Sequence, residues 1–265
     1  MDIKFSKELL RKAVLEYKPY AVVMMLSGGD DSLTAYEVAR EIGVKPDFVM
    51  HGITGTGLKE TTDFVVHYVR KKGDNLLIAN AGKAYENYVL RKGFFGVGSK
   101  AHSFSYHLLK STHFSATVSK YIRKRKRNRN VLFINGARRK ESKRREKTMI
   151  NPIKKDGSNI WVNIINEATK KDTISYLEGN SICRNPVSIK MCKSGECMCG
   201  TMQNNEMRVE AGYISPSWKR WIDSLENEVL KSHPWKWGAK IPSTFSMEKK
   251  GQLNLFRPMC VDCGE

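Results

Sequence analysis

The chain has 265 residues, of which 40% are hydrophobic and 9% aromatic, so it can bury a core and is not a disordered chain. Its apolar runs are much shorter than the roughly 20 residues that cross a bilayer, and we expect a soluble cytoplasmic protein without a membrane partner. A formal net charge of +19 favours a polyanionic partner.

The first 180 residues alternate between strand and helix patterns. In chain order, the sequence predicts a helix over 7–17, a strand over 21–26, a helix over 31–42, a strand over 47–53, a helix over 59–71, a strand over 75–79, helices over 82–91 and 101–123, and strands over 131–135 and 160–164. Strands that alternate with helices predict the α/β class, with a mostly parallel twisted sheet and helices on both faces.

After about residue 179 this alternation ends. Short helical stretches, such as 218–230, alternate with loops rich in Pro, Ser, Lys and Cys. We therefore predict a main domain over residues 1–180 and a cysteine-bearing C-terminal extension over residues 181–265 that packs against the sheet.

The first predicted strand ends in a glycine turn, Ser27-Gly28-Gly29-Asp30-Asp31-Ser32, that opens the next helix. In an open parallel sheet, ligands bind at the carboxyl ends of the strands. The two glycines let a phosphate approach the backbone, and the helix start offers free N–H groups and a positive dipole end. The Asp31 carboxylate would cap the helix or help to hold Mg²⁺. An ordinary tight turn before a capped helix is the alternative reading.

The glycine turn matches Ser-Gly-Gly-x-Asp-Ser, the signature of the PP-loop ATP pyrophosphatases, a superfamily that includes the phosphoadenylyl-sulfate (PAPS) reductases. Thr54-Gly55 followed by Glu60-Thr61 resembles the second-strand segment of that superfamily, and residues 136–145 resemble its motif Gly-x-Arg-x-x-Glu-Ser-x-x-Arg. The resemblance covers roughly residues 20–190. It implies an adenine nucleotide alpha hydrolase-like fold that cleaves ATP, with Mg²⁺, between the α- and β-phosphates.

The resemblance also implies site residues. It places Arg138 and Arg145 opposite the nucleotide phosphates, where bidentate guanidinium donors suit the task, so Asp31, Arg138 and Arg145 are the catalytic candidates. The candidates for binding the nucleotide are Ser27, Gly28, Gly29, Asp30, Asp31, Ser32, Thr54, Gly136, Arg138, Glu141 and Ser142.

All six cysteines lie in the C-terminal third. Cys197 and Cys199 form Cys-x-Cys, and Cys260 and Cys263 form Cys-x-x-Cys. Four thiolates can hold a [4Fe–4S] cluster or a Zn²⁺ ion, and spacing alone does not separate the two. The block around Cys197 resembles a subgroup of reductase-like proteins with a late Cys-x-x-Cys, which favours the cluster on these four ligands.

Two other readings of the cysteines stay open. Cys183 and Cys192 are alternative ligands, and free thiols that pack as small apolar residues are the alternative to any metal site.

Basic residues are concentrated in one region of the chain. Between Lys120 and Lys147 there are fourteen Lys or Arg residues and two acids, Glu141 and Glu146. They form two runs, from Lys120 to Arg129 and from Arg138 to Lys147. A solvated basic face is the alternative to a nucleic-acid site.

Together, the basic runs and the cysteines resemble the ATP-pyrophosphatase component of DNA phosphorothioation systems (Dnd and Ssp types). That resemblance implies an enzyme that activates a DNA phosphate so that sulfur from a cysteine desulfurase partner replaces an oxygen, together with other subunits of the modification system. The alternatives are a sulfite-forming PAPS or APS reductase, a tRNA thiolation enzyme, and a nucleotide-binding scaffold without turnover.

Overall fold

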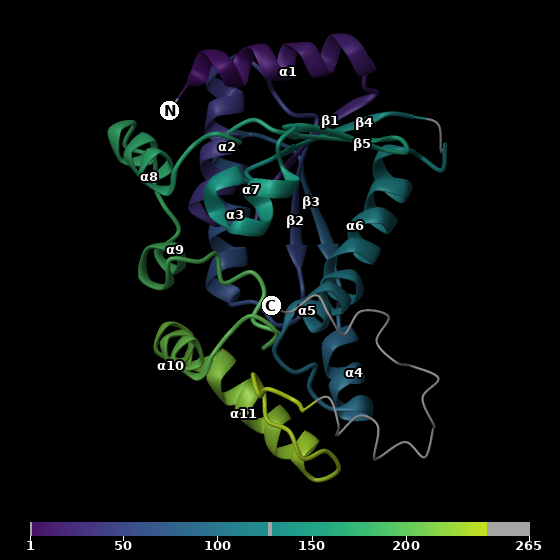
Figure 1. Cartoon of the computed structure of the whole chain (residues 1–265), viewed down its shortest axis with the longest axis vertical. Coiled ribbons are helices and arrows are strands. Elements are labelled where there is room, and N and C mark those ends of the chain that lie inside the picture. Colours follow the sequence, from purple (N-terminus) through teal and green to yellow (C-terminus); the bar gives the residue numbers. More distant parts are fainter. Residues whose placement is uncertain (1, 127–128, 243–265) are drawn as a thin grey trace.

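The computed structural model describes residues 2–126 and 129–242. One six-stranded sheet, in the order β3-β2-β1-β4-β6-β5, forms its centre (Figure 1). The strands are β1 (Ala21–Met25), β2 (Phe48–Ile53), β3 (Leu76–Asn80), β4 (Val131–Asn135), β5 (Ile153–Asp156) and β6 (Asn159–Asn163). All neighbouring pairs are parallel except β5 with β6. The predicted α/β class with a mostly parallel sheet is confirmed.

Alternate strand residues enter two different cores, as a period of two requires. Met24 packs into a core under α1 (Ile3–Tyr17), α2 (Asp30–Glu41), α3 (Lys59–Lys72) and α8 (Lys170–Gly179). Its neighbour Val23 packs on the opposite face, with Val118 and Ile122 of the π-helical segment η2 (Val118–Ile122). Because helices cover both faces, the strand reads as an unbroken apolar run.

Two predicted elements differ in detail. The predicted helix 101–123 is a rod that alternates between α- and π-helix: α5 (Ser99–Tyr106), η1 (His107–Ser111), α6 (Thr112–Thr117) and η2. The antiparallel strand β5 was not predicted, because three of its four residues are charged and only Ile153 packs against the core. Such a strand is stable only because β6 offers it a hydrogen-bonding edge.

The C-terminal part packs beyond the carboxyl ends of β2 and β3 (Figure 1). It contains α9 (Pro186–Met191), α10 (Asn205–Ile214) and α11 (Pro216–Leu230). We expected this part to pack against the sheet, but most of its apolar side chains share one core with α4 (Ala84–Lys92) and with Leu109 of η1, and Ile182 packs against the core on one face of the sheet. In the described ranges, no helix combines the length and the apolar character that crossing a bilayer demands.

Candidate functional site

The glycine turn connects β1 to α2 next to β4, where the sheet order reverses direction. Internal hydrogen bonds hold it: the Ser32 hydroxyl donates to Gly29 O at 2.9 Å and accepts from the Ser27 N–H at 3.2 Å. Gly28 has φ +81°, and a Cβ there would lie 2.8 Å from Thr61 Cγ2. The turn is therefore a prearranged cradle at the start of a 12-residue helix, which suits an anion.

Asp30 and Asp31 point in different directions from this turn. Asp30 is 2% exposed, and its carboxylate accepts hydrogen bonds from Lys170 Nζ (2.9 Å) and from Arg184 Nε (3.1 Å). Burial raises the pKa of Asp30, but the hydrogen bonds from Arg184 and Lys170 outweigh it and hold the pKa below its ordinary value. Asp30 therefore anchors α2 to α8 and to the C-terminal part as a buried anion.

Asp31 remains accessible from the cavity. Its Oδ2 forms an ion pair with Arg138 Nη2 at 2.9 Å, and its Oδ1 accepts from Thr173 Oγ1 at 3.3 Å. Arg138 is 5% exposed, and its buried Nε has no hydrogen-bond partner within the described chain. Gly136 lets the end of β4 approach α2, since a Cβ there would lie 2.4 Å from Asp31 O. The predicted catalytic residues Asp31 and Arg138 are thus in direct contact.

The rest of the arginine motif forms the opposite rim of the cavity. Glu141 ends a 3-10 turn, η3 (Arg139–Glu141), and pairs with Arg145 of α7 (Lys143–Thr148). Both side chains line the cavity. The Ser142 hydroxyl instead accepts from the Arg145 N–H at 3.2 Å and so caps α7. Ser142 therefore positions Arg145 rather than facing the cavity.

Thr54 also takes a structural place. It is fully buried, and its hydroxyl donates to Glu196 O at 2.8 Å. Thr56, two residues on, accepts from the Met198 N–H at 3.0 Å. The predicted nucleotide-binding Thr54 thus fastens the cysteine segment to the end of β2 and does not line the cavity.

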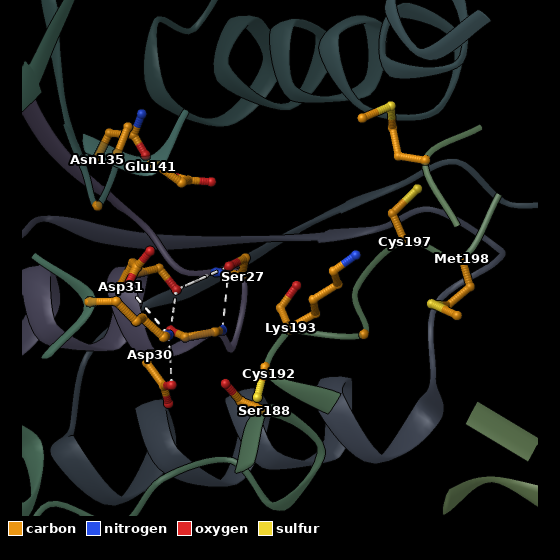
Figure 2. A pocket seen from close by; sticks show the side chains of 18 of the residues that line it. Ser27, Asp30, Asp31, Asn135, Glu141, Ser188, Cys192, Lys193, Cys197 and Met198 are labelled. Atoms are coloured by element: carbon orange, nitrogen blue, oxygen red, sulfur yellow. Dashed lines mark hydrogen bonds and ion pairs between the residues drawn. The ribbon is translucent and has the colours of Figure 1, made fainter. Parts of the chain in front are cut away.

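One cavity of about 460 Å³ joins the glycine turn to the cysteine segment. Figure 2 shows Ser27 and Asp31 on one side, Cys197 on the other, and Lys193 between them. The cationic side chains that line it are Lys110, Arg145, Lys170 and Lys193. Such a mixed basic and polar lining suits a phosphate-bearing ligand.

Cys197 faces the cavity, whereas Cys199 lies behind it. Hydrogen bonding with Cys197 and with the hydroxyl groups of Thr201 and Ser105 lowers the pKa of Cys199. The hydrogen bond with Cys199, together with burial, raises the pKa of the Cys197 thiol. Lys110, whose Nζ lies 2.7 Å from Glu196 Oε2, adds a buried positive charge beside Cys197.

The described residues include only two of the four predicted metal ligands. Among residues 2–126 and 129–242, no three His, Cys, Asp or Glu side chains come together as a metal-binding group. Cys197 and Cys199 are adjacent, whereas the other two predicted ligands, Cys260 and Cys263, lie outside the described residues. Cys183 and Cys192 are exposed free thiols, and Cys192 lines the cavity.

Four cations at the site were not predicted: Lys110, Lys170, Arg184 and Lys193. Lys170 and Arg184 lie 140 and 154 residues from Asp30 in the chain, and no motif connects them. The only local signal was at Lys170, which follows the capping residue Thr169 at the start of α8. A cation at the start of α8 lies close to the glycine turn because α8 follows the carboxyl end of β6.

The two basic runs lie at opposite ends of the central strand β4, one at the amino ends and the other at the carboxyl ends of the parallel strands. The run from Lys120 to Arg129 precedes β4 and the run from Arg138 to Lys147 follows it, so five strand residues, or about 16 Å, separate them. Arg123 of the first run has a structural role, because its guanidinium donates a hydrogen bond to Ser158 O at 2.9 Å. Only the second run reaches the cavity, and the runs are not one compact strip.

Fold and site together define an α/β nucleotide-binding protein with its phosphate loop at the carboxyl edge of a parallel sheet. The chain belongs to the phosphoadenosine phosphosulfate reductase domain family, whose model matches residues 21–202. This places it among the ATP-binding PP-loop enzymes. No curated protein sequence matches the chain.

Solved structures resemble the fold at low identity. The phosphoadenylyl-sulfate (PAPS) reductase of Candida auris, in a phosphate complex, is 17% identical over 68% of this chain and 81% of that chain, with a TM-score of 0.48. The U34-tRNA thiolase NcsA of Methanococcus maripaludis, with its [4Fe-4S] cluster, is 13% identical over 95% and 88%, with a TM-score of 0.44. At this distance neither structure says what this chain acts on.

Proposed function

We propose that the protein is an ATP pyrophosphatase that adenylates a phosphate oxygen of DNA, so that sulfur can replace that oxygen. The observation that carries the proposal is the single cavity that contains both the phosphate cradle, with Ser27 and Asp31, and the thiol of Cys197. Activation by ATP and a sulfur step need such a shared space, because the activated phosphate must meet its nucleophile before water does.

In the first step the acceptor oxygen attacks the α-phosphorus of ATP, and pyrophosphate leaves. The turn's N–H groups, Lys170 and Arg145 would stabilise the charge that develops on pyrophosphate. The accessible Asp31 carboxylate is the candidate ligand for Mg²⁺, and the Asp31–Arg138 ion pair fixes its position. In the second step a persulfide sulfur attacks the adenylated phosphorus, and AMP leaves with the oxygen. A second thiol, an external reductant, then attacks the carrier sulfur, which leaves the phosphorothioate on DNA and joins the two thiols as a disulfide.

The sulfur source is an external partner in this proposal. We infer a cysteine desulfurase and other subunits of a modification system as partners, in line with the resemblance to DNA phosphorothioation proteins. A [4Fe–4S] cluster on Cys197, Cys199, Cys260 and Cys263 is part of the proposal, with Zn²⁺ as the alternative. Anaerobic purification with an absorbance scan tests the cluster, since a colourless protein with one zinc per chain would contradict it.

The central test pairs pyrophosphate release with incorporation of ³⁵S into DNA. We expect Asp31→Ala to abolish both, because it removes the carboxylate at the cradle. Asp63→Ala, which removes an exposed acid on α3, is the matched control and should leave both unchanged. Equal labelling of DNA by Asp31→Ala and the unmodified protein would contradict the proposal.

A second candidate follows from the family itself, whose name describes a reductase of phosphoadenosine phosphosulfate. A thioredoxin-coupled assay for sulfite separates it from the first. Sulfite formed from PAPS, with no ³⁵S in DNA, would assign the reductase activity instead. Label in tRNA would assign tRNA thiolation.

A further inference from the structure

The two basic runs lie at opposite ends of the parallel strands, and the outermost strand of the sheet, β5, connects them. β5 is the last strand in the sheet order, and it runs antiparallel to β6 from the carboxyl edge back to the amino edge. Its Lys154 and Lys155 are both exposed, with Asp156 as the single acid of the strand. Positive charge therefore continues along the open side of the sheet.

At the carboxyl ends of the parallel strands, where β5 begins, the charges belong to α7 and the turn before it. Lys140, Lys143, Arg144 and Lys147 are all exposed, and their neighbour Arg145 lines the cavity. This end of the basic surface is therefore at the mouth of the site.

At the amino ends of the parallel strands, where β5 ends, the charges occupy unfavourable backbone positions. Lys18, Lys124 and Arg125 have φ angles of 42°, 48° and 65°, the left-handed region that favours glycine. All three side chains are exposed. Next to them Arg129 lies over the ring of Tyr20, 4.0 Å from the centroid, and Lys155 lies 5.8 Å from the centroid of Tyr17. Long cationic side chains at positions where glycine would be less strained indicate a role for the charge itself.

The exposed acids along this surface, Glu141, Glu146 and Asp156, are outnumbered by its cations. We call this surface the β5 band and define it by its exposed cations: Lys18, Lys124, Arg125, Lys126, Lys140, Lys143, Arg144, Lys147, Lys154 and Lys155. In the ion pairs of the described chain, none of these side chains contacts a carboxylate. They are free to neutralise an external polyanion.

We propose that the β5 band binds the backbone of one DNA duplex that runs along β5, with one end of the contact at the cavity mouth. The choice of DNA rests on the proposed function, in which the acceptor is a DNA phosphate. β5 alone spans about 14 Å, or about four base pairs, and α7 and the Lys124 turn extend the contact at both ends. The duplex is thus held by contacts remote from the reacting phosphate.

The test uses duplexes of two lengths and two triple variants of the full chain. Lys124→Gln/Arg125→Gln/Lys126→Gln removes the amino end of the band, and Lys143→Gln/Arg144→Gln/Lys147→Gln removes the carboxyl end. Binding of a 20-base-pair duplex and of a short duplex of about three base pairs (about 10 Å), closed by a hairpin loop, is measured by fluorescence anisotropy over a range of salt concentrations. Arg220→Gln/Lys236→Gln/Lys240→Gln, three exposed cations in and after α11, is the control with the same loss of charge.

We expect the amino-end triple to lose on the order of tenfold or more in affinity for the long duplex, with the salt slope reduced by about 2 to 3. It should bind the short duplex, held at the cavity mouth, like the unmodified protein. The carboxyl-end triple should weaken both complexes. A loss on the long duplex no larger than that of the control would overturn the proposal, as would equal losses of the amino-end triple on both lengths, or a loss on duplex RNA only.

A pair of glycine variants separates binding from folding. Lys124→Gly/Arg125→Gly relieves the backbone, so it should raise the urea midpoint while it lowers affinity for the long duplex. Unchanged affinity in that stabilised variant would contradict the band. Binding of ATP in the absence of DNA should stay unchanged in both amino-end variants. If the unmodified protein binds the long duplex through the band but never transfers ³⁵S to it, the proposed function fails and the band stands.

Discussion

The consecutive residues Asp30 and Asp31 show that the contacts of a side chain determine its role. Asp30 and Asp31 are consecutive in the first turn of α2, yet Asp30 is buried against Lys170 and Arg184 while Asp31 faces the cavity beside Arg138. Each residue of a helix turns the side-chain direction by about 100°, so Asp30 points inward when Asp31 points to the ligand. Only Asp31 remains available to the chemistry.

Replacing Asp30 should therefore cost stability. In Asp30→Asn the cation Arg184, which is 14% exposed, loses the buried one of its two carboxylate partners and keeps the exposed Glu178. We expect unfolding to become easier by about 3 kcal/mol, the low end for a broken buried pair, because Lys170 is 40% exposed. Urea denaturation measures this. Asp63→Asn, whose carboxylate pairs with Lys59 at the surface, is the control and should cost less than about 1 kcal/mol.

The same carboxylate should also give stability a dependence on pH. The pKa of Asp30 is lower in the folded protein than the value of about 3.9 in an unfolded chain. Its contribution is therefore complete above the unfolded value and is lost as the pH falls through the folded value. The stability difference between Asp30→Asn and the unmodified protein should be constant from pH 6 to 8 and shrink below about pH 4. A difference that grows on acidification would contradict this assignment.

At the scale of elements, the site depends on how closely β4 approaches α2. β4 ends at Asn135, and Gly136 then passes over the first turn of α2, where a Cβ would lie 2.4 Å from Asp31 O and 2.7 Å from Ser32 Cα. Both neighbours are backbone atoms and cannot rotate away. This contact determines where Arg138 meets Asp31.

Gly136→Ala should push the two elements apart. We expect a loss of about 2 kcal/mol in unfolding free energy and a loss of pyrophosphate release, because the Asp31–Arg138 pair would be displaced. Chemical denaturation and a pyrophosphate assay measure the two effects. Gly179→Ala is the matched control: it adds the same methyl group at the end of α8 with nothing within 4 Å, and it should be neutral or stabilising by up to about 1 kcal/mol. Full turnover in Gly136→Ala would show that the close contact does not matter.

At the scale of the whole molecule, the amino-acid composition changes near residue 180, but one hydrophobic core contains residues from both sides of that boundary. Trp218 of α11 is 5% exposed and donates its Nε1–H to Thr56 O, just after β2, at 2.9 Å. Leu58, Tyr85 and Leu109 share its core. The C-terminal part should therefore unfold together with the sheet.

Trp218→Ala tests this cooperation. We expect a loss of about 3 to 5 kcal/mol, because a large buried aromatic leaves a cavity and an unpaired carbonyl. Far- and near-ultraviolet circular dichroism should still report one coincident transition. Tyr213→Ala, on α10 and 85% exposed, should change stability by no more than about 0.5 kcal/mol. Two separate transitions in Trp218→Ala would instead make the C-terminal part an independent domain.

By itself, the sequence determined the elements and the turn. Apolar spacing and the glycines of residues 27–32 act over a few neighbours, so the parallel sheet, its helices and the phosphate cradle could be predicted from local pattern. The strand β5 could not, because its stability comes from the free edge of β6 and not from its own charged residues.

Only the tertiary structure decided which side chains meet. The partners of Asp30, the use of Thr54 to hold Glu196, and the position of Cys197 in the cavity join residues about 140 positions apart. The packing of α8 and of the C-terminal part against the ends of β1 and β2 brings those segments together, and no local pattern encodes it. The fold also separated two basic runs that are nearly continuous in the chain, since β4 carries them to opposite ends of the parallel strands.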